Sequence, residues 1–530
     1  MVRLDTVPRP IDHVALDGDA NAPALVTKAE TLTFSDLEAA VGALAAALQR
    51  AVPETGARVA TWLPKTVEAC LMPLAAPRAG LVHVPVNPVL KRAQVAHILQ
   101  DSGAALLLTS ASRAATFEAG DVPAGCVIWD EGEAKGIRLA ERSEVVVRAE
   151  REPREEVSLS LDGASRFARR SDYLPPSDAN PNDLAAILYT SGSTGRPKGV
   201  MLSHTNLWLG AVSVAHYLKI EPDDRTLAVM PLGFDYGQNQ LLSTWKAGGA
   251  VYPFDYLLAK DVWRAIEANG ITTLGCVPPL WLQLLESGAP PATGVRRITN
   301  TGGALTPAMI ERLRPRFPNA DIYPMYGLTE AFRSTYLPPE LVAAHPSSMG
   351  RAIPFAEIMA VAKDGSEAVP GAPGELVHAG PLVARGYWQD AERTAERFRP
   401  APAFSEYGGT AVWSGDTVTR DADGLFYFVG REDEMIKSSG HRISPMEIEQ
   451  AALGSGIVAE AVAHGIFDVA LGQAIRLVVR GTGDGDALAT YLKRELPSHM
   501  QPRVVEWRDE LPRNANGKVD RAAISGDYIV

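Results

Sequence analysis

A buried-strand pattern that runs directly into a glycine-rich loop constrains this chain more than any other feature. The apolar run Ala185–Leu188 is typical of a buried strand, and the loop Thr190-Ser-Gly-Ser-Thr-Gly-Arg-Pro-Lys198 follows it. Glycines let backbone N–H groups converge on one concavity, which hydroxyl and cationic side chains complete as an anion site. The pattern therefore predicts a polyphosphate site at the end of a strand. Because Gly199 follows Lys198, the loop is not a Walker A sequence.

Length and charge narrow the possible classes of protein. The chain has 530 residues, several times a usual domain of about 150, so we expect one large domain and one small domain. The net charge of −12 argues against a nucleic-acid partner, since such binding depends on neutralising phosphates. An anionic cofactor must then be held by local cations and N–H groups.

The cysteines and the apolar runs predict the compartment. Three scattered cysteines (Cys70, Cys126 and Cys276) indicate a reducing environment and no metal cluster. The N-terminus lacks an apolar signal core, and no apolar run approaches the roughly 20 residues of a membrane span. We therefore expect a cytoplasmic protein without a membrane span.

Alternating strand and helix patterns predict the architecture. Between residues 184 and 395, short apolar or β-branched runs alternate with helical stretches, which favours parallel or mixed sheets with helices on their faces. The charge-dense residues 131–182 are typical of a surface insertion. We expect an α/β protein with a large multi-layer domain over residues 1–430 and a small α+β domain over residues 431–530.

Two local predictions concern the N-terminal part. The runs Ala24–Lys28 and Thr31–Phe34 have the pattern of a hairpin. Ser35 and Glu38 have the spacing of a capping box in front of a helix that extends to Gln49.

The whole string from Leu188 to Val200 resembles the phosphate loop of AMP-forming adenylating enzymes, which include acyl-CoA synthetases, peptide-synthetase adenylation domains and luciferases. Further motifs in the family's order extend the resemblance over nearly the whole chain. It implies that ATP and Mg²⁺ are cofactors and that the small domain is mobile. In the loop it implies phosphate contacts for Thr190, Ser191, Gly192, Ser193, Thr194, Gly195 and Lys198.

Three more motifs resemble the nucleotide site of that family. In Tyr326-Gly-Leu-Thr-Glu330, the resemblance implies a nucleotide contact from Tyr326. It also implies a phosphate contact from Thr329 and a Mg²⁺ contact from Glu330, both catalytic. Thr301-Gly-Gly-Ala304 is similar to the stretch that contacts adenine, through Gly302, Gly303 and Ala304. In Trp413-Ser-Gly-Asp416, the carboxylate of Asp416 would accept from the ribose hydroxyls. Each motif alone is equally typical of an ordinary turn.

The C-terminal motifs resemble the moving parts of the family. Gly430-Arg-Glu-Asp433 matches a hinge, in which Arg431 contacts the nucleotide and Asp433 is the pivot. Lys437–Ile443 resembles the loop that lines a thiol tunnel, with Ser439 and Gly440 close to the thiol. Lys518 occupies the position of the lysine that bridges the substrate carboxylate and the α-phosphate during adenylation.

The resemblance implies a two-step acid–thiol ligase. A carboxylate attacks the α-phosphate of ATP and releases pyrophosphate; a thiol of CoA or of a phosphopantetheinyl carrier protein then takes the acyl group and releases AMP. The alternatives are a free-standing enzyme that loads an amino acid onto a carrier protein only, a luciferase-type oxidase, an inactive nucleotide-binding scaffold, and a phosphotransfer enzyme that would release ADP instead of AMP.

The acid is the open question. Phe234-Asp235 resembles the pair that binds the α-ammonium of an amino acid in peptide-synthetase adenylation domains. Alternatively, the substrate is a plain acyl acid and Asp235 pairs with Arg333. By resemblance, the acid pocket also includes Tyr236, Asn239, Cys276, Thr299, Thr301, Met325 and Ser334. This mixed, fairly polar set disfavours a long fatty chain.

One stretch suggests a subfamily. Residues 326–339 are similar to acyl-CoA ligases associated with the exosortase A system of bacteria. That resemblance would imply a role near exopolysaccharide and protein-sorting functions, with a dedicated acyl carrier protein as the partner.

Overall fold

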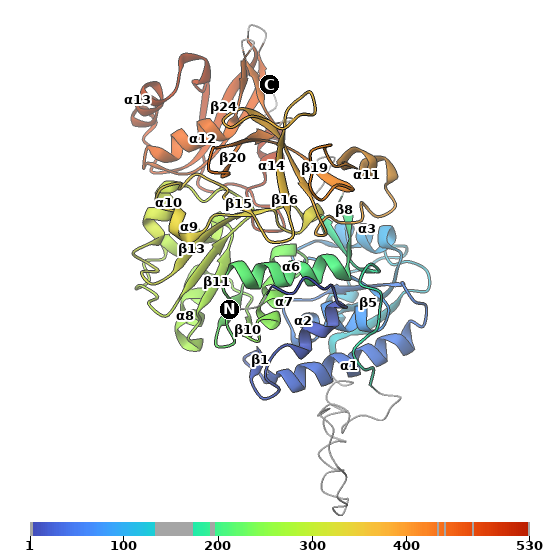
Figure 1. The fold of residues 1–530 in the computed structure, drawn as a ribbon. Helices are drawn as coiled ribbons and strands as arrows, with labels where there is room; N and C mark the ends of the chain where they lie inside the picture. Colours follow the sequence, from blue (N-terminus) through green and yellow to red (C-terminus); the bar gives the residue numbers. More distant parts are fainter. Residues whose placement is uncertain are drawn as a thin grey trace, which may run out of the picture.

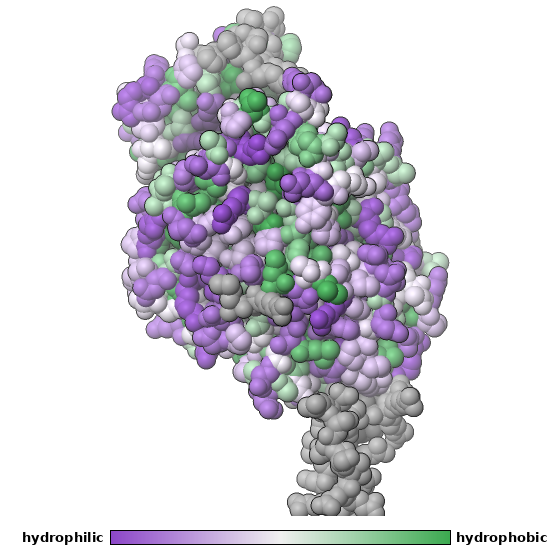
Figure 2. Space-filling view, in the orientation of Figure 1, coloured by the Kyte–Doolittle hydropathy of each residue, from purple (hydrophilic) through white to green (hydrophobic). Residues whose placement is uncertain are grey.

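The computed structural model describes residues 4–132, 173–190, 197–431, 434–438, 441–468 and 471–527. These residues form a large lower body and a smaller C-terminal unit above it (Figure 1). Among the described residues, no helix is both long and apolar enough to cross a membrane. Hydrophilic side chains cover most of the face seen in Figure 2.

A six-stranded sheet carries the glycine-rich loop. Its strands are parallel apart from the last, β8, which runs antiparallel to β7. In spatial order they are β6 (Val127–Asp130), β5 (Ala104–Thr109), β3 (Arg58–Trp62), β4 (Val82–Pro85), β7 (Leu184–Thr190) and β8 (Lys198–Ser203). The helices of this part are α1 (Phe34–Ala51), α2 (Val67–Arg78), α3 (Arg92–Ser102) and α4 (Ala111–Ala114).

A nine-stranded sheet provides the second half of the large body. Its central strands are parallel, because helices connect them. In spatial order the strands are β15 (Arg351–Ala352), β14 (Thr335–Tyr336), β13 (Asp321–Tyr326), β12 (Arg297–Asn300), β11 (Thr273–Cys276), β9 (Arg225–Ala228), β10 (Ala250–Pro253), β1 (Pro23–Val26) and β2 (Thr31–Thr33).

Helices and short 3₁₀ turns complete this half. They are η1 (Ile11–Leu16), α6 (His204–Tyr217), α7 (Asp235–Lys246), α8 (Ala259–Asn269), α9 (Pro278–Glu286), α10 (Pro307–Leu313), η3 (Thr329–Ala331) and η4 (Pro339–Leu341). Helix α6 crosses the middle of the large body (Figure 1) and is buried on nearly all sides. One continuous apolar core joins residues of both sheets, from Ile11 to Leu425.

A smaller antiparallel sheet leads to the C-terminal unit. It contains β16 (Glu357–Val361), β17 (Pro373–Ala379), β18 (Phe398–Pro400), β19 (Thr410–Arg420) and β20 (Phe426–Arg431), with α11 (Ala391–Arg397) beside it. Because β20 ends at Arg431, this sheet brings the chain to the predicted hinge.

The C-terminal unit has its own apolar core, which includes Ile448, Leu477, Val479 and Leu488. Its strands are β21 (Ile436–Ser438), β22 (His441–Ile443), β23 (Val458–Asp468), β24 (Gly472–Gly481) and β25 (Val504–Trp507). Its helices are α12 (Pro445–Gly454), α13 (Gly485–Glu495), η5 (Ser498–Met500) and α14 (Arg521–Gly526). The predicted fold class, a large α/β domain with a small α+β domain, is confirmed.

The two local predictions for the N-terminal part have different outcomes. The predicted hairpin is present as β1 and β2. The predicted capping box is wrong: the helix begins at Phe34, and the box joins Thr33 and Asp36 instead of Ser35 and Glu38. Most of the predicted insertion, residues 133–172, lies outside the described residues.

Candidate active site

The ends of β7 and β8 hold the described part of the predicted phosphate site. Thr190 and Lys198 face each other across these two strands, so the intervening loop begins and ends at one place. The buried Oγ1 of Thr190 has no hydrogen-bond partner within the described part of the chain. A buried hydroxyl without a partner costs about 1–3 kcal/mol, so this donor suits a ligand oxygen.

Lys198 and Glu330 form an ion pair at this position. The Lys198 Nζ donates to Glu330 Oε1 at 3.0 Å and to the Tyr387 hydroxyl at 2.6 Å. The Tyr387 hydroxyl donates in turn to the same Glu330 oxygen at 2.6 Å. Burial alone would raise the pKa of Glu330, but Lys198 and these hydrogen bonds outweigh it and hold the pKa below its usual range. Glu330 is therefore a carboxylate, as a Mg²⁺ ligand must be.

Sequence reasoning missed Tyr387. The tyrosine is buried, and its contact with Glu330 spans 57 residues of chain. It belongs to no motif quoted above, so only the tertiary fold reveals its place beside Lys198.

A strained backbone at Phe332 separates the side chains of Glu330 and Arg333. Thr329 and Glu330 lie in the short turn η3, and Phe332 has a φ of 62°, which a residue with a side chain rarely adopts. The Phe332 ring fills the space above Gly210 of α6, where an added Cβ would lie 2.3 Å from the ring. This arrangement directs Glu330 to the predicted phosphate site and Arg333 to the predicted acid pocket.

The predicted ribose site is assembled by two adjacent strands. Asp416 on β19 and Arg431 on β20 are register partners. Arg431 Nε donates to Asp416 Oδ1 at 2.7 Å, and the hydroxyl of Tyr326 donates to the other oxygen. Asp416 is 2% exposed. Three predicted nucleotide residues therefore meet at one carboxylate.

The glycines of the predicted adenine stretch make room for Lys518. Gly302 has a φ of +78°, and a Cβ there would lie 2.4 Å from Cε of Lys518. Gly303 and Ala304 are exposed beside it. Lys518 Nζ also lies 4.8 Å from the centre of the Phe234 ring. The small domain thus inserts its lysine among residues of the large domain that are predicted to bind the nucleotide and the acid.

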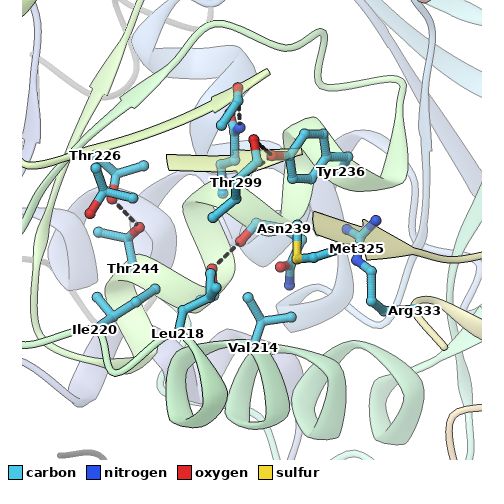
Figure 3. A pocket seen from close by; sticks show the side chains of 14 residues that line it. Val214, Leu218, Ile220, Thr226, Tyr236, Asn239, Thr244, Thr299, Met325 and Arg333 are labelled. Carbon is cyan, nitrogen blue, oxygen red and sulfur yellow. Dashed lines mark hydrogen bonds between the residues drawn. The ribbon is translucent and has the colours of Figure 1, made fainter. Parts of the chain in front are cut away.

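The predicted acid pocket lies between α6, α7 and the nine-stranded sheet (Figure 3). Tyr236 is hydrogen-bonded to Thr299, with 2.5 Å between the two hydroxyl oxygens. Asn239 and Arg333 face a cavity of about 20 Å³, room for about one water molecule. Asn239 Nδ2 and Arg333 Nε have no hydrogen-bond partner among the described residues. The pocket is compact, and the unsatisfied groups that line it among the described residues are these two donors and one acceptor, Oε1 of Gln240.

Cys276 and Thr301 are buried in the same region. Burial raises the pKa of the Cys276 thiol, so this side chain is a neutral wall and not a nucleophile. The Thr301 hydroxyl accepts a weak hydrogen bond from Arg333 Nη1 at 3.4 Å.

Asp235 is the uncompensated charge of the site. It is 6% exposed at the start of α7, and within the described residues no lysine or arginine nitrogen lies within 4.0 Å of its carboxylate. Burial raises its pKa, and the more distant charges of Arg333 and Lys518 offset this only in part. Arg333 is placed over the Tyr236 ring, 5.0 Å from its centre, so the two do not form a contact pair.

Several predicted residues lie outside the described residues: Ser191, Gly192, Ser193, Thr194, Gly195, Asp433, Ser439 and Gly440. The flanking residues Thr190, Lys198 and Arg431 are described, and they mark the two ends of the predicted phosphate loop and the start of the predicted hinge. The roles of the eight others stay predictions.

The fold and the site define a nucleotide-dependent enzyme of two domains. A family model described as AMP-binding enzyme matches residues 12–388, and its companion C-terminal domain matches residues 447–518. This chain therefore belongs to the AMP-binding enzyme family.

Named relatives include free-standing ligases and parts of much longer synthases. Over 506 residues the chain is 32% identical to sulfoacetate–CoA ligase from Cupriavidus necator, covering 92% of this chain and 91% of that protein. It is 28% identical over 521 residues to gramicidin S synthase 2 from Aneurinibacillus migulanus, covering 97% of this chain but 11% of that protein. The chain thus spans only a small part of the length of such synthases.

The fold also matches solved structures. With ATP-bound MatB from Rhodopseudomonas palustris the TM-score is 0.84 at 24% identity, over 98% of this chain and 99% of that one. This likeness confirms the arrangement of a large and a small domain.

Proposed function

We propose that this chain is an AMP-forming acid–thiol ligase. It adenylates a carboxylic acid with ATP and then transfers the acyl group to the phosphopantetheine thiol of CoA or of a carrier protein. The observation that carries the proposal is the position of Lys518, which reaches from the small domain to Gly302 and Phe234 of the large domain. A scaffold that only binds nucleotide has no need of a lysine there.

In the first step, a carboxylate oxygen attacks the α-phosphorus of ATP, and the bond to pyrophosphate breaks. The Lys518 ammonium would stabilise the charge that develops at the reacting oxygens. Thr190, Lys198 and Thr329 would hold the phosphates, and Asp416 and Arg431 the ribose. Mg²⁺, which Glu330 would hold together with the phosphates, supplies charge neutralisation for the leaving pyrophosphate. Glu330 fits that role because it is ionised.

In the second step, we propose that the small domain rotates about Asp433, with its boundary at residues 430 and 431. Rotation withdraws Lys518 and brings Ser439 and Gly440 to the thiol. The thiolate sulfur attacks the carbonyl carbon of the acyl-adenylate, and the bond to AMP breaks. In each of the two orientations, the small domain would cover the site and exclude water from the adenylate.

We propose an amino acid, or another amino-bearing acid, as the substrate. The support is Asp235, a buried carboxylate without a contacting cation in the described part of the chain. Lys518 is close enough to influence its pKa, so an ammonium beside the substrate carboxylate would meet Asp235 while the carboxylate meets Lys518. The second candidate is a small plain acid, with Asp235 balanced at a distance by Arg333.

Product analysis tests both parts of the proposal. The protein is incubated with ATP, Mg²⁺, CoA and pairs of acids that differ only in the amino group. We expect AMP and pyrophosphate in equal amounts, with the amino-bearing member preferred by at least about tenfold. Release of ADP would overturn the ligase, and equal rates within each pair would remove the ammonium role of Asp235.

A further inference from the structure

Asn87 connects the two domains directly behind the reacting lysine. It lies in the loop after β4, and its Nδ2 donates to the Ala515 carbonyl oxygen at 2.7 Å and to Asn516 Oδ1 at 3.0 Å. Asn87 is 6% exposed, and its partners are 428 and 429 residues away in the chain. We propose that Asn87 is a positioning residue that locks the lysine loop in place for adenylation and releases it for the thiol step.

The loop that Asn87 contacts is closed by its own hydrogen bonds and ends at Lys518. The Asn514 side-chain oxygen accepts from the backbone N–H groups of Asn516, at 3.0 Å, and of Lys518, at 3.1 Å. The Asn514 N–H donates to the Lys518 carbonyl oxygen at 2.8 Å. Because these bonds close a compact turn, fixing Ala515 and Asn516 also fixes the backbone of Lys518.

The receiving surface belongs to the acid site. A Cβ on Gly233 would lie 2.7 Å from the backbone nitrogen of Asn87, so the Asn87 loop packs against the segment that leads to Asp235. The next residue, Phe234, lies under the Lys518 ammonium. Asn87 therefore holds the lysine loop against the same segment that presents the acid pocket.

The two ends of the Asn87 amide have separate tasks. Its Oδ1 accepts from the Val89 N–H at 3.1 Å, which shapes the loop within the large domain. Its Nδ2 faces the small domain. The ion pair of Arg480 with Glu286 also joins the domains, at 3.0 Å, but these side chains are 23% and 41% exposed, and such pairs contribute little.

Because the oxygen and the nitrogen of the Asn87 amide contact different domains, one substitution can remove the contact with the small domain alone. Asn87→Asp retains an oxygen for the Val89 N–H but replaces the donor with a second acceptor, which faces the fixed Ala515 carbonyl oxygen. The proposal rests on the two-step function, so the two half-reactions are measured separately: ATP–pyrophosphate exchange with the best acid, and thioester formation from supplied acyl-adenylate and CoA. Glu286→Gln is the control for a domain contact at the rim.

We expect Asn87→Asp to slow exchange by about ten- to a hundredfold, as for the loss of two hydrogen bonds, and to leave thioester formation and Tm unchanged. Glu286→Gln should change exchange by less than about twofold. Equal loss in both half-reactions, or unchanged exchange, would overturn the role of Asn87. Absence of exchange in the wild-type protein with every acid would instead refute the proposed function.

A second variant tests the same contact by a substitution in the small domain. Asn516→Ala removes one acceptor from the small-domain side and leaves Asn87 intact. We expect a several-fold loss of exchange, and a smaller effect of Asn87→Asp when both changes are combined, because the two residues share one contact. If the two substitutions lowered the rate of exchange in a strictly additive way, the direct contact between Asn87 and Asn516 would have no role in adenylation.

Discussion

Two carboxylates of the candidate site, Glu330 and Asp235, have opposite environments. Glu330 has a cation and a hydroxyl in contact, and its pKa is lowered. Asp235 has no contacting cation within the described residues, and its pKa is raised. The folded protein thus stabilises the charge of Glu330 and is destabilised by the charge of Asp235. This arrangement is expected when Asp235 binds a charged ligand.

Asp235→Asn should therefore stabilise the free protein at neutral pH. Since the folded-state pKa of Asp235 is raised, its contribution to stability is present at low pH and is lost as pH rises through that pKa. We expect Tm to increase by roughly 2 °C at pH 7, and the gain to vanish near pH 4. Adenylation of the amino-bearing substrate should fall at the same time.

Glu330→Gln is the matched substitution, and we expect it to shift Tm in the opposite direction from Asp235→Asn. The folded-state pKa of Glu330 is lowered, so its stabilisation is present above the unfolded pKa and is lost as pH falls through the folded pKa. Removal of the charge should cost about 2 kcal/mol at pH 7, seen as a lower Tm. A Tm shift of the same sign in both variants would contradict the assignment of the two environments.

Motif residues could be predicted from the sequence, but their supporting partners could not. Asp416 and Arg431 come from separate motifs, and the strand register brings them together. Tyr387 and Asn87 contact Glu330 and the lysine loop across 57 and 428 residues. Such contacts depend on how sheets and domains pack, which a local pattern does not encode.

At the scale of elements, the start of α1 gives a direct stability test. The Thr33 hydroxyl accepts from the Asp36 N–H at 3.1 Å, and Asp36 accepts from the Thr33 N–H at 3.1 Å. Thr33→Ala should cost about 1 kcal/mol, whereas Ser35→Ala, at the position favoured by the sequence pattern, should stay within about 0.5 kcal/mol. Urea unfolding midpoints compare the two; a larger effect at Ser35 would contradict the observed cap.

The spacing rule failed at α1 because two candidate boxes overlap. Glu38 fits the sequence pattern, but its carboxylate accepts from Arg78 Nη1 at 2.9 Å and from the Tyr173 hydroxyl at 2.5 Å. This buried pairing with α2 uses the carboxylate that the predicted box required. Tertiary electrostatics thus decided where the helix begins.

At the scale of the whole molecule, the alternating pattern and the motif order predicted the two-domain α/β fold. The relative position of the domains was not predictable, because it depends on a few contacts such as those of Asn87. The three cysteines are free. The cytoplasmic location and the exosortase-related subfamily stay predictions.

The most direct test of the ligase account separates the two half-reactions in Lys518→Ala. ATP–pyrophosphate exchange and thioester formation from supplied acyl-adenylate are measured for the wild-type protein and the variant. We expect exchange to fall by at least about a hundredfold, since a charge at the reacting centre is lost, while thioester formation stays within about twofold. Equal loss of both half-reactions, or exchange that survives the substitution, would contradict a lysine that serves adenylation alone.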